Sequence, residues 1–331
     1  MAYKTSAMGG KKALVTGGLG FIGSNLAHKL VALGAEVAVY DACLDPYGWN
    51  FANINEIRNR VKFVKGDVRD RGKMEAVVKG QDFVFHCAAQ VSHLDSMRGP
   101  FLDVDINCNG TLSVLEACRK NADGAKIIYA GTRAQIGREE YSPVDEKHPT
   151  NPIDVYGIDK LAAEKYCLLY GSAYGMPACS LRINNTFGPR HQMKHAKFGI
   201  LNWFIRLALE GQEIPVYGKG EQVRDYNYVD DAVDAMILAA QSKKADGEVF
   251  NLGSGRQTRF VDMARAVVKA AGSGSIKHVP WPDERKRIET GDFFVSYAKI
   301  KKTLGWSPKT SFEDGLGKTI DFYRGRLREY V

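Results

Sequence analysis

The chain has 331 residues, 44% of them hydrophobic and 25% charged, with a formal net charge of +8. This length exceeds one typical domain, and the composition is that of an ordinary globular protein. No run of about 18 apolar residues occurs and residues 1–12 lack the apolar core of a secretion signal, so we expect a cytoplasmic protein without a membrane partner. The basic residues are spread along the chain, which argues against a nucleic-acid partner. Six cysteines without a CxxC pair favour free thiols and no metal site.

The first half of the chain alternates short apolar runs with helical patterns. An apolar run at 13–16 leads into glycines and then a helix in which Ile22, Leu26 and Leu30 recur at helical spacing. Further strands are expected at 37–40, 61–64, 83–87, 126–130 and 178–183, and helices at 104–119 and 156–174. Apolar strands that alternate with helices predict a parallel sheet covered on both faces.

Beyond residue 183 the alternation becomes looser. We expect helices at 198–210, 230–241, 260–271 and 312–323, a Pro/Gly-punctuated segment at 214–220, and a returning strand at 248–252. The pattern indicates a smaller C-terminal part interleaved with the first domain.

The segment after the first strand has the pattern of a dinucleotide-binding loop. It satisfies both GxxGxxG and GxGxxG, follows a strand, opens a helix, and precedes an acidic residue, Asp41, by about 20 positions. Such a loop lets a pyrophosphate rest on the helix N-terminus, while Asp41 would bind the adenosine ribose and repel a 2′-phosphate, favouring NAD over NADP. Asp67 would meet the adenine edge or serve as a turn residue. The expected cofactor contacts are Gly17, Gly20, Phe21, Ile22, Gly23, Asp41, Asp67, Val68, Ala88, Ala89, Asn107, Tyr156 and Lys160.

A candidate catalytic group lies at the fifth strand and the helix after it. Tyr156 and Lys160 are one helical turn apart, and we expect the lysine charge to lower the pKa of the phenol so that it can act as a base. Thr132 directly follows the strand and could bond the same substrate oxygen. Tyr297 and Lys301 repeat the spacing, but they lie in the tail, away from the strand ends, and we interpret them as surface or packing residues.

Together these motifs resemble the extended short-chain dehydrogenase/reductase family. The resemblance rests on residues 15–25, 86–89, Asn107 with Gly110 and Thr111, 156–160 and 304–308, and is closest in pattern to UDP-glucose or UDP-glucuronate 4-epimerases. It implies an α/β fold: a Rossmann-like doubly wound parallel sheet with a smaller C-terminal α/β substrate-binding domain. The NAD-binding domain would comprise 1–183 plus about 225–255, and the substrate-binding domain about 184–224 plus 256–331.

The resemblance also implies functional residues. Thr132, Tyr156 and Lys160 match the catalytic group, Lys160 would hold the nicotinamide ribose, and Asn107 would support the site. The substrate would be a nucleotide-diphosphate sugar, a UDP-sugar being favoured, bound by a homodimer paired through the helices at 104–119 and 156–174. Its expected contacts are Thr132, Arg133, Asn185, Asn202, Val216, Tyr217, Arg224 and Arg287. For Arg287 a solvated position in a charged run is an equal alternative.

The residues after Thr132 bear on the reaction. Relatives that are 4,6-dehydratases carry an Asp-Glu pair there, whereas this chain has Arg133 and Ala134. We therefore expect a 4-epimerase that works by transient oxidation to a 4-keto sugar with retained NADH. A 4,6-dehydratase or decarboxylase stays an alternative, and a non-catalytic NAD-binding or nucleic-acid-binding protein a remote one. The basic loop 188–195 would face an acidic sugar or, as a simpler interpretation, solvent.

Overall fold

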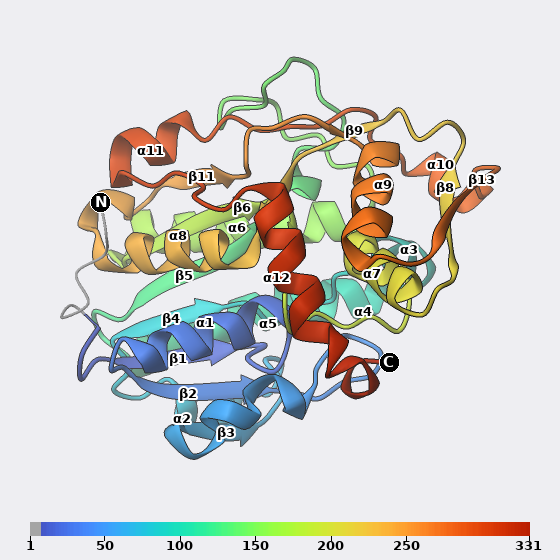
Figure 1. The fold of residues 1–331 in the computed structure, drawn as a ribbon. Helices are drawn as coiled ribbons and strands as arrows, with labels where there is room; N and C mark the ends of the chain where they lie inside the picture. Colours follow the sequence, from blue (N-terminus) through green and yellow to red (C-terminus); the bar gives the residue numbers. More distant parts are fainter. Residues whose placement is uncertain (1–7) are drawn as a thin grey trace.

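A seven-stranded parallel sheet forms the centre of the computed structural model, which describes residues 8–331 (Figure 1). Its strand order is β11-β6-β5-β4-β1-β2-β3. The strands are β1 (Lys12–Thr16), β2 (Glu36–Asp41), β3 (Val61–Lys65), β4 (Phe83–His86), β5 (Lys126–Thr132), β6 (Ala178–Ile183) and β11 (Val249–Leu252). Each apolar run expected to be a strand is one, because a strand buried on both faces reads as continuous apolar sequence.

Helices cover both faces of this sheet. In β1, Ala13 and Val15 belong to one hydrophobic core, whereas Leu14 between them belongs to another, as the two-residue period of a strand requires. The first core is covered by α1 (Phe21–Ala32) and α8 (Val229–Gln241), and the second by α2 (Arg71–Val77), α5 (Gly110–Asn121) and α6 (Val155–Tyr174). The predicted doubly wound α/β fold is confirmed.

Three two-stranded sheets and several helices form a second layer beside the carboxyl ends of the strands (Figure 1). The strand pairs are β7 (Asn185–Phe187) with β10 (Tyr226–Tyr228), β9 (Val223–Arg224) with β12 (Thr258–Arg259), and β8 (Glu213–Tyr217) with β13 (Ser275–Val279). The helices are α7 (Ile200–Leu209), α9 (Phe260–Ala271), α10 (Asp283–Arg287) and α12 (Phe312–Arg324). By contrast α11 (Ala298–Leu304), which falls in the range expected for the second domain, packs against β11 of the large sheet.

The segment between β4 and β5 differs from the single helix expected at 104–119. It contains α3 (His93–Arg98), α4 (Pro100–Val104), a π turn over Asp105–Asn109, and then α5. The helical path is continuous from α4, so the helix starts earlier than its hydrophobic pattern indicates and widens at the π turn. Single-turn π insertions are often found at functional sites. The 3₁₀ segments are η2 (Phe51–Arg60), η4 (Arg133–Gln135), η5 (Lys243–Ala245) and η6 (Leu327–Glu329).

The C-terminal segment is anchored to the loop after β7. The hydroxyl of Tyr323, a fully buried side chain on α12, accepts from the His191 N–H at 2.8 Å and donates to the His191 carbonyl at 2.8 Å. The Met193 N–H donates to the Tyr330 carbonyl at 3.2 Å. The last turns of the chain thus hold residues 191–193 in place. Within residues 8–331, no helix combines the length and apolar character needed to cross a membrane.

Candidate active site

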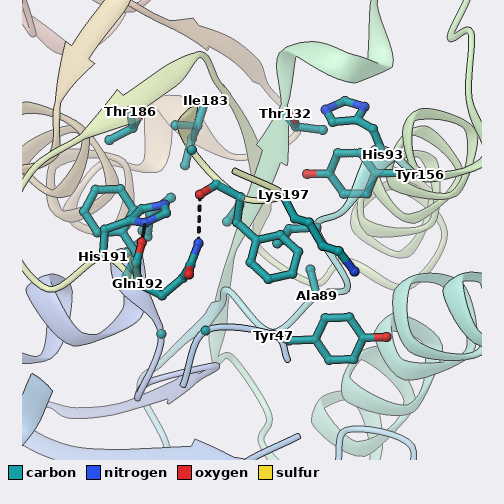
Figure 2. A pocket seen from close by; sticks show the side chains of 18 of the residues that line it. Tyr47, Ala89, His93, Thr132, Tyr156, Ile183, Thr186, His191, Gln192 and Lys197 are labelled. Atoms are coloured by element: carbon teal, nitrogen blue, oxygen red, sulfur yellow. Dashed lines mark hydrogen bonds between the residues drawn. The ribbon is translucent and has the colours of Figure 1, made fainter. Parts of the chain in front are cut away.

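A cleft of about 500 Å³ opens where the carboxyl ends of the sheet strands meet the second layer. Its walls come from the loops after β1, β2, β4, β5 and β6 and from segments of the second layer. In an open α/β sheet, ligands bind at this edge. Figure 2 shows side chains from both parts converging on the cavity.

The glycine-rich loop after β1 leaves room for a ligand's phosphates. Gly17 has φ +67°, and a Cβ there would lie 2.7 Å from the Ala88 backbone nitrogen, so only glycine fits. Gly20 caps α1 without a side-chain hydrogen bond, so no side chain of the cap competes for the amides of the first turn. Gly17, Gly20, Phe21, Ile22, Gly23, Ala88 and Ala89 all line the cleft. This arrangement fits a dinucleotide pyrophosphate.

Two acidic residues flank the same end of the cleft. Asp41 accepts hydrogen bonds from the backbone N–H groups of Leu19 at 3.0 Å and Cys43 at 2.9 Å, which fix its carboxylate at the end of β2. Asp67 lines the cleft beside Val68, but both of its oxygens are held by Arg69, at 2.9 Å and 2.7 Å. Asp41 is therefore positioned to meet a ribose, whereas Asp67 already has a bidentate ion pair.

Thr132, Tyr156 and Lys160 are brought together on the opposite wall. Thr132 ends β5, and Tyr156 lies at the start of α6, so both side chains line the same part of the cleft (Figure 2). Lys160 follows one turn later, with its Nζ 4.2 Å from the centroid of the Tyr129 ring. All three members of the expected catalytic group line the cleft. Tyr297 instead packs against Trp306, with ring centroids 6.0 Å apart.

Burial has the largest effect on the pKa values of Tyr156 and Lys160. Burial raises the pKa of Tyr156 well above that of a free phenol, while the hydrogen bond from Thr132 and the charge of Arg133 act in the other direction. Burial also lowers the pKa of Lys160 to about 8. The expectation that the Lys160 charge sets the pKa of the phenol is not met in the protein alone, because desolvation of both groups outweighs it.

His93 is a functional candidate that sequence reasoning missed. It begins α3, lines the cleft, and its ring lies edge-on to Tyr156 at a centroid distance of 5.0 Å (Figure 2). The His93 Nδ1 and an Asp154 carboxylate oxygen are 2.5 Å apart, and the other oxygen of Asp154 caps α6 by accepting from the Gly157 N–H at 2.7 Å. The sequence feature that could have identified His93 is its place in the loop after the fourth strand, where active-site residues gather in this kind of sheet.

The expected substrate contacts divide into three groups: residues that line the cleft, residues buried behind it, and one residue exposed outside it. Arg133, Asn185, Tyr217 and Arg224 line the cleft. Val216 and Asn202 are instead buried behind it, with Asn202 bonded to the Gly188 carbonyl at 2.8 Å. Arg287 is exposed outside the cleft, whereas Arg285, on the same short helix, is on the cavity wall and stacks over Tyr217.

Asn107 supports the site from outside. It lies in the π turn, 2% exposed, and is absent from the cleft wall. Its amide donates to the Gln90 carbonyl at 3.1 Å and to Asp103 at 2.9 Å, while its oxygen accepts from the Gln90 N–H at 3.1 Å. Asn107 thus braces the loop after β4 that carries Ala88 and Ala89, rather than meeting the cofactor directly.

This combination of loop, acidic strand end and Thr-Tyr-Lys group defines an NAD-dependent enzyme of the extended short-chain dehydrogenase/reductase class. The chain belongs to the family described as GDP-mannose 4,6 dehydratase, which matches residues 14–319. That family covers epimerases, dehydratases and decarboxylases of nucleotide sugars, and its NAD-bound structures support NAD as the cofactor here.

Three similar proteins illustrate the match. A putative UDP-glucose 4-epimerase of Methanocaldococcus jannaschii is 33% identical over 319 residues, which are 95% of this chain and 99% of that protein. The structure of an epimerase of Methanothermobacter thermautotrophicus has a TM-score of 0.92 at 28% identity and covers 98% of this chain and 95% of that one. The Thermus thermophilus UDP-glucose 4-epimerase complex with NAD has a TM-score of 0.84 at 32% identity, with 95% and 99% covered.

Proposed function

We propose that this chain is an NAD-dependent nucleotide-sugar 4-epimerase, with a UDP-sugar as substrate. Among residues 8–331, the carboxyl groups that line the cleft are those of Asp41, Asp67 and Glu289. The first two lie at the cofactor end, and Glu289 forms an ion pair with Arg224. None of these three cleft-lining carboxyl groups offers the acid–base pair beside Thr132 and Tyr156 that expulsion of water across C5 and C6 needs, and Asp154, next to Tyr156, lies outside the cleft wall and is bonded to His93. This absence is the observation that carries the proposal.

The remaining groups suffice for epimerisation. Tyr156 takes the proton of the C4 hydroxyl, and Thr132 holds the same oxygen through its own hydroxyl. NAD, when bound, supplies the hydride acceptor and donor. Lys160 orients the ribose and places a positive charge beside the phenol. Without a carboxyl pair to eliminate water, the 4-keto sugar accepts the hydride back at C4 on its other face.

The size and chemistry of the cleft support a tethered sugar. Tyr217 and Trp281 lie with ring centroids 5.3 Å apart, a surface on which a nucleobase can stack. Asn185 offers its side-chain amide nearer the catalytic group. Anchoring the nucleotide far from C4 allows the sugar to present either face to Tyr156, since the binding energy comes from a part that does not turn.

The test is product analysis. The protein is incubated with UDP-sugars in deuterated water, and Tyr156→Phe serves as the inactive control. A 4-epimerase gives a product of unchanged mass with inverted C4 and with protium retained at C4, because the hydride never exchanges with solvent. A product lighter by one water or one carbon dioxide contradicts the proposal.

A 4,6-dehydratase is the second candidate, and His93 is the observation that favours it. A histidine held by Asp154 beside Tyr156 is an acid–base group at the reacting centre. If it replaces the missing carboxyl pair, His93→Gln stops loss of water while C4 oxidation still produces an absorbance change at the nicotinamide. If water is never lost in the unmodified protein, this candidate is excluded.

A further inference from the structure

Arg133 carries a positive charge into the cleft, and its hydrogen-bond partners there are neutral. It follows Thr132 at the start of η4 and lines the cavity. Its Nε donates to the Asn185 side-chain oxygen at 3.3 Å, and its Nη1 donates to the Thr290 hydroxyl at 3.1 Å. The face of the guanidinium lies 5.1 Å from the centroid of the Phe293 ring. These contacts fix the orientation of the guanidinium group without neutralising its charge.

Arg182 and Arg224, which are buried whereas Arg133 is half-buried, are both neutralised. Arg182 forms a bidentate pair with Glu164, at 2.6 Å and 3.1 Å, and Arg224 pairs with Glu289. Across residues 8–331, no carboxylate forms an ion pair with Arg133. A charge removed from water without a counter-ion costs free energy. Burial lowers the pKa of Arg133 to about 10; the charge of Arg224 acts in the same direction, whereas the carboxylates of Glu289 and Asp154 act in the other. The site therefore favours an anion at this point.

The position of Arg133 indicates which anion. In the proposed reaction C4 of the sugar lies against Thr132 and Tyr156, whereas the diphosphate leaves the ring at C1, across from C4. Arg133 directly follows Thr132 and lines the same cleft, so its guanidinium can face substituents on the ring carbons next to C4, and C5 is one of these. A carboxylate at C6 would meet the guanidinium fork in the bidentate geometry that arginine prefers.

We propose that Arg133 is a specificity residue that receives the C6 carboxylate of a nucleotide hexuronate. The proposal rests on the proposed 4-epimerase reaction for the placement of C4. Because the 4-keto ring turns over between its two orientations, the carboxylate meets Arg133 in one of them, so the two C4 epimers are bound unequally. The substrate also carries a diphosphate, a second anion that Arg133 could bind. The experiment must therefore distinguish binding of the carboxylate from binding of the diphosphate.

Equilibrium binding tests the proposal without reference to turnover. Dissociation constants of UDP, UDP-glucose, UDP-glucuronate and UDP-galacturonate are measured by calorimetry on the NAD-loaded Tyr156→Phe protein, in which the C4 epimers are not interconverted. With Arg133 intact, this protein should bind the tighter hexuronate about tenfold more strongly than UDP-glucose. Arg133→Gln should remove that preference and leave UDP and UDP-glucose unchanged. Arg133→Lys should keep part of it, because the charge remains but the fork is lost.

Controls distinguish the other outcomes. Arg138→Gln, five residues later, exposed and outside the cleft, should alter nothing. If Arg133→Gln weakens all four ligands by the same factor, Arg133 binds the diphosphate and the proposal is wrong. The proposal is also overturned if the protein with Arg133 intact has equal affinity for UDP-glucose and both hexuronates, or if it binds no UDP compound. A product without C4 inversion would refute the proposed reaction while leaving this binding result in place.

Discussion

Tyr156 and Lys160 deviate from their ordinary proton affinities for the same reason. Both side chains are buried at the wall of the cleft, and burial disfavours the phenolate form of Tyr156 and the ammonium form of Lys160. Thr132 and Arg133 partly offset this at the phenol. The groups that lower the pKa of the Tyr156 phenol are thus its neighbours on β5 and η4.

Replacing Tyr156 with Phe removes the proton acceptor and keeps the ring. We expect turnover to fall by about 10²- to 10⁴-fold while UDP-sugar affinity is retained, because the phenol oxygen acts mainly in the transition state. Steady-state kinetics and calorimetry measure the two quantities. Tyr297→Phe is the matched control and should behave like the unmodified protein; near-normal turnover in Tyr156→Phe would remove the mechanism.

His93 and Asp154 should act as one unit. His93→Gln removes the ring, and Asp154→Ser removes the carboxylate but keeps an oxygen that can cap α6. We expect each to lower kcat by about tenfold with little change in KM, and the double variant to be no worse than either single variant, since coupled residues are not additive. The pH profile of kcat should move in both. Additive losses, or unchanged profiles, would show that the contact has only a structural role.

At the scale of elements, His86 joins three of them beneath the cofactor loop. Its ring bonds Thr16 of β1 at 2.8 Å and Thr111 of α5 at 3.0 Å, while His86 itself ends β4. Burial lowers the pKa of His86 to about 3. The folded state therefore binds fewer protons here than the unfolded state between pH 6.5 and 3.

Stability should accordingly fall as the pH drops through this window. The stabilisation from a neutral His86 is complete above about pH 6.5 and decreases toward pH 3, by up to about 1.4 kcal/mol per pH unit from this group. Urea unfolding of the unmodified protein and His86→Gln at several pH values isolates the contribution. The variant should be less stable at pH 7 but show the shallower decline; parallel curves would contradict the assignment.

Helices and strands with a strong hydrophobic periodicity were predictable from the sequence. Those that depend on contacts with distant parts of the chain were not. The parallel strands and α9 follow from local apolar patterns, with α9 matching the expected 260–271. The strand β8 was not foreseen, because Pro215 and Gly218 indicate a turn while its pairing partner β13 lies about 60 residues away. Likewise Thr132, Tyr156 and Lys160 follow from their places at strand ends, whereas His93 depends on a contact with Asp154 from another element.

At the scale of the whole molecule, several large apolar side chains are exposed on neighbouring helices. The helices α3, α4 and α6 pack together and expose Met97, Phe101, Ile158 and Leu169, with Phe101 86% exposed. Such patches mark association surfaces. Leu115, by contrast, is fully buried in the core beneath α5. We therefore propose that the expected homodimer pairs through the α4 and α6 surface.

Charged substitutions on this surface should separate the subunits. Phe101→Asp combined with Leu169→Glu should yield a monomer by light scattering, because each buries a charge in an apolar interface. Tyr141→Ala, an exposed aromatic residue on another part of the chain, should leave the mass unchanged. A monomeric mass for the unmodified protein at micromolar concentration would contradict the dimer.

The anchoring of residues 191–193 by Tyr323 and Tyr330 has a consequence for how the protein is made. A ribosome delivers the chain from its N-terminus, and domains fold in that order. The glycine loop, Asp41 and the Thr-Tyr-Lys group, together with α8 and β11 that complete the large sheet, have all emerged before α12 exists. Because His191 and Gln192 form part of the cleft wall, the nascent protein can hold its cofactor before it can enclose a substrate. Truncated chains that end before Tyr323 should therefore bind NAD but show no catalytic activity.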